Sequence, residues 1–175
     1  MLEVINPVDE QNNFTNPKEI VSSVADMYRP TIFLAGPCPR TDYSDDWRFE
    51  AIKYLEEAGF DGIVFNPTNS KYDVNDKDYL TKQTGWECDA MFSSDKVVFW
   101  IPRDEEHPAF TTNIELGQFL NYDDIDKIVI GMPDKAIKNE YIKVRLKLLG
   151  KEYYKDLKEL MNAVVEETKY NFVGA

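Results

Sequence analysis

The chain has 175 residues, of which 43% are hydrophobic and 30% are charged, and its formal net charge is −12. A chain of this length can bury the core of one compact domain, and its hydrophobic content is too high for a disordered protein. The negative charge repels the phosphate backbone of a long nucleic acid, and the sequence contains no basic cluster that would offset this repulsion. We therefore expect no binding of long nucleic acids, although one or two arginines are enough to hold a small nucleotide.

The sequence also lacks the marks of a membrane, secreted or metal-binding protein. No apolar run approaches the roughly 20 residues that a membrane-spanning helix needs, and residues 1–11 lack the basic and apolar segments of a signal peptide. Cys38 and Cys88 are too few for a disulfide framework, and the single histidine, His107, has no cysteine pair nearby to complete a zinc site. We expect a cytoplasmic protein with reduced thiols, no metal ion and no membrane contact.

In chain order, short apolar segments alternate with longer segments of helical periodicity, which is typical of a parallel α/β fold. Residues 1–30 are predicted to form an irregular N-terminal extension with one candidate strand at 3–5, ahead of a single domain at 31–175. The strands predicted within that domain are 31–35, 63–65, 96–101, 127–130 and a short one at 152–154.

The predicted helices are 45–58, 79–92, one that begins near residue 112, and one that contains 157–168. Ser44 is expected to cap the first of them. Residues 139–149 fit two interpretations, because their alternation suits a half-buried strand whereas their composition suits a helix that ends at Gly150. We favour the helix.

Ligands of parallel sheets bind at the carboxyl ends of the strands, so the loops after residues 35, 65 and 101 are the places to search. The first loop begins with Gly36 but lacks the Gly-Lys-Ser/Thr ending of a phosphate-binding loop and the further glycines of a dinucleotide fingerprint. ATP and NAD are therefore not expected as cofactors. Cys38 has no histidine nearby that would activate it as a nucleophile, and His107, which follows three acidic residues, is interpreted as a surface side chain.

Four short motifs occur in a characteristic order and spacing. They are Ile-Phe-Leu-Ala-Gly-Pro at 32–37 with Arg40, Trp47-Arg48, Trp86-Glu87 ahead of Asp95, and Thr-Asn-Ile-Glu-Leu-Gly at 112–117. Together they resemble the nucleoside 2-deoxyribosyltransferase-like family over most of residues 31–170. The resemblance implies a flavodoxin-like five-stranded parallel sheet with helices on both faces. It also implies a nucleoside or nucleotide substrate, no cofactor, and assembly as a homo-oligomer.

The resemblance further implies that a glutamate attacks the anomeric carbon of the sugar and displaces the base. Glu115 matches that nucleophile, and Glu87 matches the carboxylate that contacts and helps to protonate the departing base. Two carboxyl groups suit this chemistry, because one must be ionised to attack while the other carries a proton. The chain departs from the family at Phe33, where a tyrosine is expected, and at Ala109-Phe110, where an aspartate is expected.

The remaining site residues are assigned by type. Phe33, Trp86 and Phe110 are expected to line the base pocket, Arg40 and Arg48 to contact a phosphate or the sugar, Thr112 and Asn113 to position the sugar, and Gly36, Trp47 and Asn66 to border the site. An arginine clamp would suit a nucleoside 5′-monophosphate better than a free nucleoside.

Structural alternatives exist for several of these residues. Thr112 and Glu115 fit a helix capping box, Trp47 and Trp86 fit core packing, and Arg48 fits an ion pair with Glu50 or Asp45. Three functions remain open: transfer of the glycosyl group to another base, its transfer to water by a nucleotide N-glycoside hydrolase, and nucleotide binding without catalysis.

Overall fold

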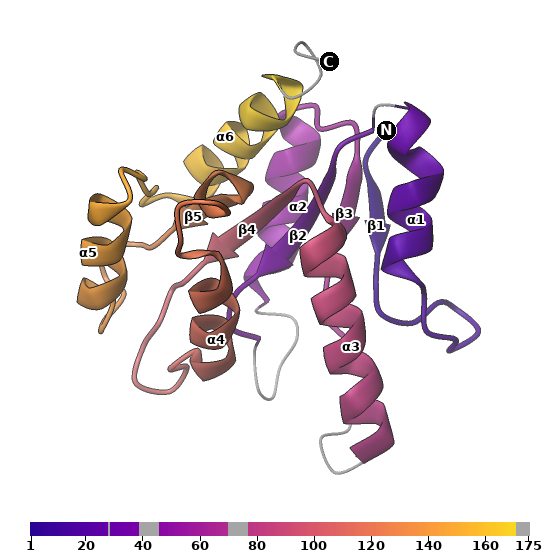
Figure 1. Cartoon of the computed structure of the whole chain (residues 1–175), viewed down its shortest axis with the longest axis horizontal. Coiled ribbons are helices and arrows are strands. Elements are labelled where there is room, and N and C mark those ends of the chain that lie inside the picture. The colour runs from indigo at the N-terminus through magenta and orange to yellow at the C-terminus, as the bar shows by residue number, and fades with distance from the viewer. Residues whose placement is uncertain (28, 39–45, 70–76, 171–175) are drawn as a thin grey trace.

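The structure is a computed structural model that describes residues 1–27, 29–38, 46–69 and 77–170. Its centre is a five-stranded, all-parallel sheet with the strand order β1-β3-β2-β4-β5 (Figure 1). The strands are β1 (Glu3–Ile5), β2 (Thr31–Ala35), β3 (Ile63–Phe65), β4 (Lys96–Trp100) and β5 (Ile128–Gly131). The predicted α/β, flavodoxin-like fold class is therefore confirmed.

Helices cover both faces of the sheet (Figure 1). On one face lie α1 (Pro17–Val24), α3 (Lys77–Ser93), α4 (Phe110–Phe119) and α5 (Glu140–Leu148), and on the other lie α2 (Trp47–Glu57) and α6 (Leu157–Tyr170). Two short 3-10 turns, Ala25–Met27 and Ile125–Lys127, complete the described elements. No helix in the described part of the chain is both long and apolar enough to cross a membrane.

The central strands are apolar almost throughout because helices bury them on both sides. Alternate side chains of β2 enter the two cores, with Phe33 on the side of α3 and α4 and Leu34 on the side of α2 and α6. Phe33 is in register with Phe65 of β3 and Val97 of β4. Because all strands are parallel, their carboxyl ends and the loops that follow meet at one edge of the sheet.

Two predictions about the sheet edges are corrected. The segment 152–154 forms no strand, and Tyr154 makes only one isolated bridge to Gly131. The fifth strand is instead β1, the candidate strand at 3–5, which pairs with β3. The irregular structure predicted for residues 1–30 is also wrong for α1, which is capped by Asn16 and packs against α3.

The helix boundaries fit the predictions in part. Residues 139–149 contain the favoured helix, α5, and the apolar stripe of α6 is buried as expected. The predicted cap Ser44 lies outside the described residues, and Asp46 is the N-cap of α2, since its carboxylate accepts the N–H of Arg48. Helix α4 begins at Phe110, two residues before the predicted start.

Candidate active site

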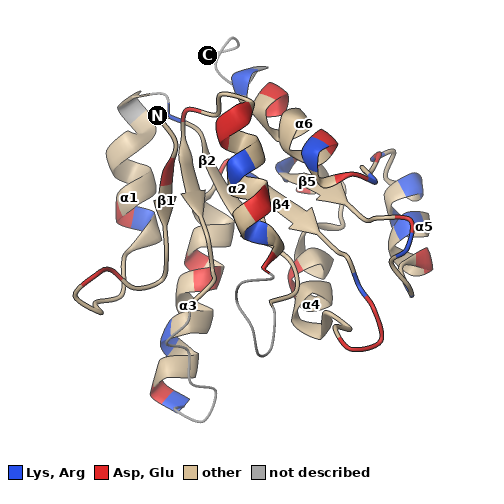
Figure 2. Cartoon of the chain, turned by 180° about the vertical axis from the view of Figure 1, so that it is seen from behind, with Lys and Arg blue, Asp and Glu red and all other residues tan. Residues whose placement is uncertain are grey.

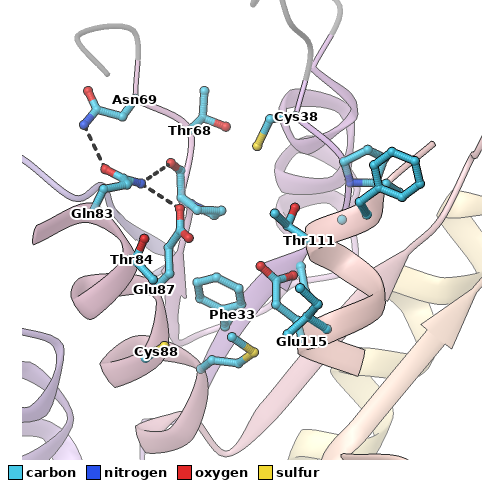
Figure 3. Close-up of a pocket in the computed structure, with 18 of the residues that line it drawn as sticks. Phe33, Cys38, Thr68, Asn69, Gln83, Thr84, Glu87, Cys88, Thr111 and Glu115 are labelled. Atoms are coloured by element: carbon cyan, nitrogen blue, oxygen red, sulfur yellow. Dashed lines mark hydrogen bonds between the residues drawn. The ribbon is translucent and has the colours of Figure 1, made fainter. Parts of the chain in front are cut away.

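A cavity of about 540 Å³ opens at the carboxyl edge of the sheet, between α3 and α4. Its walls come from the end of β2 and the loop after it, the loop after β3, one face of α3, and the loop after β4 with the start of α4. The three loops singled out from the sequence are therefore the ones that meet around the cavity. Figure 3 shows a close-up of the residues that line it.

The two predicted catalytic glutamates both line this cavity. Glu87 enters from α3 and Glu115 from α4, and their carboxyl groups point into the same space above the ring of Phe33 (Figure 3). Phe33 itself is buried and forms the floor between the two helices. Residues that are distant in the sequence thus form one site with two carboxyl groups over an apolar floor.

The surroundings raise the pKa of both carboxyl groups. Burial in the cavity wall and, second, the charge of Glu87 raise the pKa of Glu115 from an ordinary 4.5 to about 7, against the opposing effect of Arg48. Burial also raises the pKa of Glu87, but a hydrogen bond from Gln83 and the charge of Arg48 lower it. Glu115 therefore retains its proton up to about pH 7.

Gln83 holds the Glu87 side chain and was not recognised from the sequence. Its amide Nε2 donates to Glu87 Oε1 at 2.8 Å and to the backbone oxygen of Pro67 at 3.1 Å. Its own oxygen accepts a hydrogen bond from Asn69 Nδ2 at 3.1 Å, and the same amide of Asn69 donates to Tyr79 Oη at 2.8 Å. The signal that could have found Gln83 is its position one helical turn before Glu87.

Arg48 lines the cavity, but most of its hydrogen-bond donors are already bound to other groups of the protein. Its side chain is 1% exposed and donates to the backbone oxygens of Leu34 (3.0 Å), Pro37 (3.3 Å) and Gly36 (2.7 Å) and to Asp46 Oδ1 (3.1 Å). Four of the five guanidinium N–H groups are thereby used, which leaves no pair for bidentate binding of a phosphate. The ion-pair alternative is met by Asp46 and not by Glu50. Asp45 and the second predicted arginine, Arg40, lie outside the described residues.

Two other predicted site residues, Trp47 and Asn66, support the cavity from behind, whereas Gly36 lines it. Trp47 packs against Gly36, where an added Cβ would lie 2.4 Å from the Trp100 oxygen, and its Nε1 donates to Pro37. Asn66 Oδ1 accepts the backbone N–H of Thr68. Neither residue lines the cavity as the structure describes it.

Trp86, which was predicted to line the base pocket, does not line the cavity as the structure describes it. The indole is buried behind Phe33, packs against Phe33 and Phe65, and donates its Nε1 to Thr15 Oγ1 at 2.8 Å. The alternative interpretation, core packing, describes it correctly. Phe33 and Phe110 do line the cavity, as predicted.

The start of α4 corrects the capping-box interpretation. The N-cap is Ala109, which has left-handed backbone (φ 54°) and no capping side chain, so Glu115 lies in the second turn of the helix. Thr112 is fully buried, and its hydroxyl has no hydrogen-bond partner among the described residues, whereas Asn113 Oδ1 accepts a hydrogen bond from Arg103. Neither lines the cavity, and Thr111 occupies the position beside Glu115 instead (Figure 3).

His107, interpreted from the sequence as a surface side chain, lies at the rim of the cavity. Its Nδ1 is 3.1 Å from Asp104 Oδ1, in an acidic run that Figure 2 shows on the loop leading to α4. Among the described residues, no group of three or more histidine, cysteine, aspartate or glutamate side chains is arranged to hold a metal ion.

Comparison with known proteins agrees with this arrangement. Residues 29–136 match the family model described as nucleoside 2-deoxyribosyltransferase like, which is more than half of the chain. The chain therefore belongs to the nucleoside 2-deoxyribosyltransferase-like family, as its motifs suggested. A search of the curated proteins found no match. The matched segment contains both Glu87 and Glu115, together with all the other residues that line the cavity.

Proposed function

We propose that the protein cleaves the N-glycosidic bond of a nucleoside, with Glu115 as nucleophile and Glu87 as the group that exchanges a proton with the base, and that it passes the glycosyl group to another base. The observation that carries this proposal is the pair of carboxyl groups that enter one cavity from α3 and α4. Membership of the family supplies the substrate class.

In the first step a carboxylate oxygen of Glu115 attacks C1′ of the sugar. The bond between C1′ and the base nitrogen breaks, its electron pair stays on the base, and the base takes the proton that Glu87 carries. The products are a neutral free base, a glycosyl ester on Glu115 and an ionised Glu87. In the second step the nitrogen of an incoming base attacks C1′, Glu115 leaves as a carboxylate, and Glu87 takes the proton that the incoming base loses.

The reactive state of the pair is the one that holds a single proton. Before the substrate binds, that proton is favoured on Glu115, whose pKa is about 7, while the hydrogen bond from Gln83 favours an ionised Glu87. Attack needs the proton on Glu87 and an ionised Glu115. A base placed against Glu87 supplies it, because its developing negative charge attracts the proton to that side as the glycosidic bond weakens.

A neutral nucleoside suits this cavity better than a 5′-monophosphate. Arg48 is occupied by carbonyl oxygens and Asp46, so its guanidinium group has no pair of N–H donors free for a phosphate. Two carboxyl groups inside the cavity, and the acidic run Asp104–Glu106 that precedes the lining residue His107, repel a phosphate dianion (Figure 2). We infer a preference for the unphosphorylated substrate, contrary to the preference expected from the sequence.

Hydrolysis is the second candidate, and one observation favours it. The rim formed by Phe110 and Ile114 is largely exposed, so water can reach an ester on Glu115 in a single copy of the chain. A homo-oligomer, which the family resemblance implies, would cover this rim if it assembled through the face of α4. The balance between transfer and hydrolysis then depends on how completely the rim is closed.

The test is a screen of nucleosides and their 5′-monophosphates, each with and without a different free base, followed by chromatography. Appearance of a new nucleoside only when the acceptor base is present supports transfer, and free sugar without an acceptor supports hydrolysis. The Glu115→Gln variant is the matched control for contaminating activity. Saturable binding with no base release from any substrate would refute the proposed catalysis and leave a binding protein.

A further inference from the structure

We propose that Gln83 is the positioning residue of Glu87, and that it assigns the two oxygens of that carboxyl group different tasks: Oε1 is held by the protein, and Oε2 exchanges the proton with the base. This inference rests on the proposed function and assigns a role to a residue that the reaction scheme above does not use. Gln83 is buried on α3, four residues before Glu87, and both side chains line the cavity.

The orientation of the Gln83 amide is fixed by its partners. The backbone oxygen of Pro67 can only accept a hydrogen bond, so the Gln83 atom 3.1 Å from it must be the NH2 nitrogen. That nitrogen also faces Glu87 Oε1 at 2.8 Å, while the Gln83 oxygen accepts from Asn69 Nδ2. A flipped amide would place two acceptors against each other at Pro67 and two donors against each other at Asn69.

A fixed donor restricts where Glu87 can carry a proton. Oε1 receives the N–H of Gln83, so a proton on that oxygen would face another hydrogen and lose the bond. The proton of a neutral Glu87 therefore lies on Oε2. Since Pro67 and Asn69 belong to the loop after β3, the same contacts tie α3 to this loop and fix the carboxyl plane relative to the cavity.

The charged and titratable groups around Glu87 do not duplicate this effect. Arg48 stabilises the ionised form from the side of α2, but its N–H groups are bonded to other acceptors. Glu115 enters the same cavity from α4, where the charge of Glu87 raises the pKa of Glu115, and the thiols of Cys38 and Cys88 have pKa values that burial raises. Gln83 is the side chain whose hydrogen bond to Glu87 lowers the pKa of that carboxyl group.

The test compares two substrates that differ in their need for a proton. The base of 2′-deoxyguanosine must be protonated as it leaves, whereas that of N7-methyl-2′-deoxyguanosine is already cationic and leaves without a proton. In the Gln83→Met variant, we expect kcat for 2′-deoxyguanosine to fall by at least about 20-fold and kcat for the methylated substrate by less than about threefold. Equal losses on the two substrates would mean that Gln83 only maintains the fold, and would overturn the proposal.

A second measurement does not depend on turnover. Carboxyl titration of Glu87 by carbon-13 nuclear magnetic resonance should show its pKa higher in Gln83→Met than in the parent chain, because the N–H donor to the ionised form is lost. An unchanged or lower pKa of Glu87 would overturn the proposal even if the enzyme proved inactive. The parent chain could also release no base while the pKa of Glu87 still rises in Gln83→Met. That result would count against the proposed function alone and not against the role of Gln83.

Two further variants control for disruption of the fold. Gln83→Asn keeps a polar amide but is one methylene too short to span Glu87 and Pro67, and it should show the same selective loss on 2′-deoxyguanosine. In a Glu87→Gln background, Gln83→Met should change the remaining turnover of 2′-deoxyguanosine by less than about twofold, because the group it positions is already inactive. A large additional loss in that background would contradict a role through Glu87.

Discussion

Two pairs of charged side chains lie near the loop after β2, and their surroundings differ. Arg48 and Asp46 are 1% and 0% exposed, 3.1 Å apart, and surrounded by hydrogen-bond partners. Glu87 and Glu115 instead present like charges to one cavity, where burial raises the pKa of both. The opposite charges of Arg48 and Asp46 neutralise each other. The like charges of Glu87 and Glu115 are neutralised only when the pair binds a proton or a ligand.

The difference shows which charges build the loop and which are available for chemistry. A buried ion pair with its remaining hydrogen bonds satisfied fixes local geometry and has little affinity left for a ligand. Two carboxyl groups that cannot both ionise without mutual repulsion are poised to exchange a proton near neutral pH. Arg48 links the two regions, because its charge lowers the pKa of both glutamates from beneath the loop.

The largest expected effect is on turnover at the pair Glu87 and Glu115. Glu115→Gln should lower base release by at least about 10⁴-fold, since an amide is a poor nucleophile, while the fold is kept because Glu115 makes no capping hydrogen bond to α4. Chromatography of released base measures the loss, and circular dichroism checks the fold. Turnover within tenfold of the parent chain would show that Glu115 is not the nucleophile.

At the pair Arg48 and Asp46, the expected effect is on stability. Arg48→Met should lower the free energy of unfolding by about 3–5 kcal/mol, because Asp46 is left buried without its counter-ion and three carbonyl oxygens lose a donor. Urea denaturation measures this change, and Lys53→Met, at an exposed position of the same helix, should cost less than about 0.5 kcal/mol.

Arg48→Met also separates a structural arginine from a phosphate clamp. We expect the ratio of kcat/KM for a nucleoside to that for its 5′-monophosphate to stay within about twofold of the parent value. A selective loss on the monophosphate would restore the role predicted from the sequence. Comparable stability of Arg48→Met and Lys53→Met would show that the buried pair contributes little.

The sheet could be predicted from the sequence because its central strands are short, apolar almost throughout and bounded by turn residues. Strand β2 and strand β4 are of this kind, and helices bury both of their faces. A segment of three residues is too short to show an apolar pattern from which a strand can be predicted. The segments 3–5 and 152–154 differ in outcome because of the neighbour each one meets: β3 accepts a partner along the whole of β1, whereas Tyr154 reaches β5 at a single bridge.

The site was predicted where residue type determines the chemistry, and missed where it depends on partners. Glu87 and Glu115 reach the cavity as expected. Thr112 has the chemistry of an N-cap, but the left-handed Ala109 starts α4 earlier and turns that threonine into the core. The sequence shows that Arg48 is charged, but it does not show that backbone carbonyl oxygens occupy the guanidinium group.

A smaller effect should appear in the pH dependence of stability. The pKa of Glu115 is raised from an ordinary 4.5 to about 7 in the folded chain, so its contribution to folding is fully present below pH 4.5 and is lost as the pH rises through 7. Glu115→Gln removes this loss. We expect the variant to melt several degrees above the parent chain at pH 8 and at nearly the same temperature at pH 4.5. A difference that did not change with pH would place the effect elsewhere than in ionisation.

The smallest effect is expected at the rim, where an apolar side chain is neither part of the fold nor of the charged pairs. Phe110 is 72% exposed yet lines the cavity beside Thr111, so its ring can cover a bound substrate without contributing to the core. Phe110→Ala should raise KM by about three- to fivefold, equivalent to roughly 1 kcal/mol of lost apolar contact, with kcat and the melting temperature almost unchanged. It should also increase the share of glycosyl groups passed to water, because the ester on Glu115 becomes more accessible.

Tyr122→Ala, at a position that is 78% exposed and away from the cavity, is the control and should change neither KM nor the share of hydrolysis. If both variants raised KM equally, the rim would have no specific part in binding. If hydrolysis stayed constant while KM rose, Phe110 would contact the substrate without shielding the ester from water.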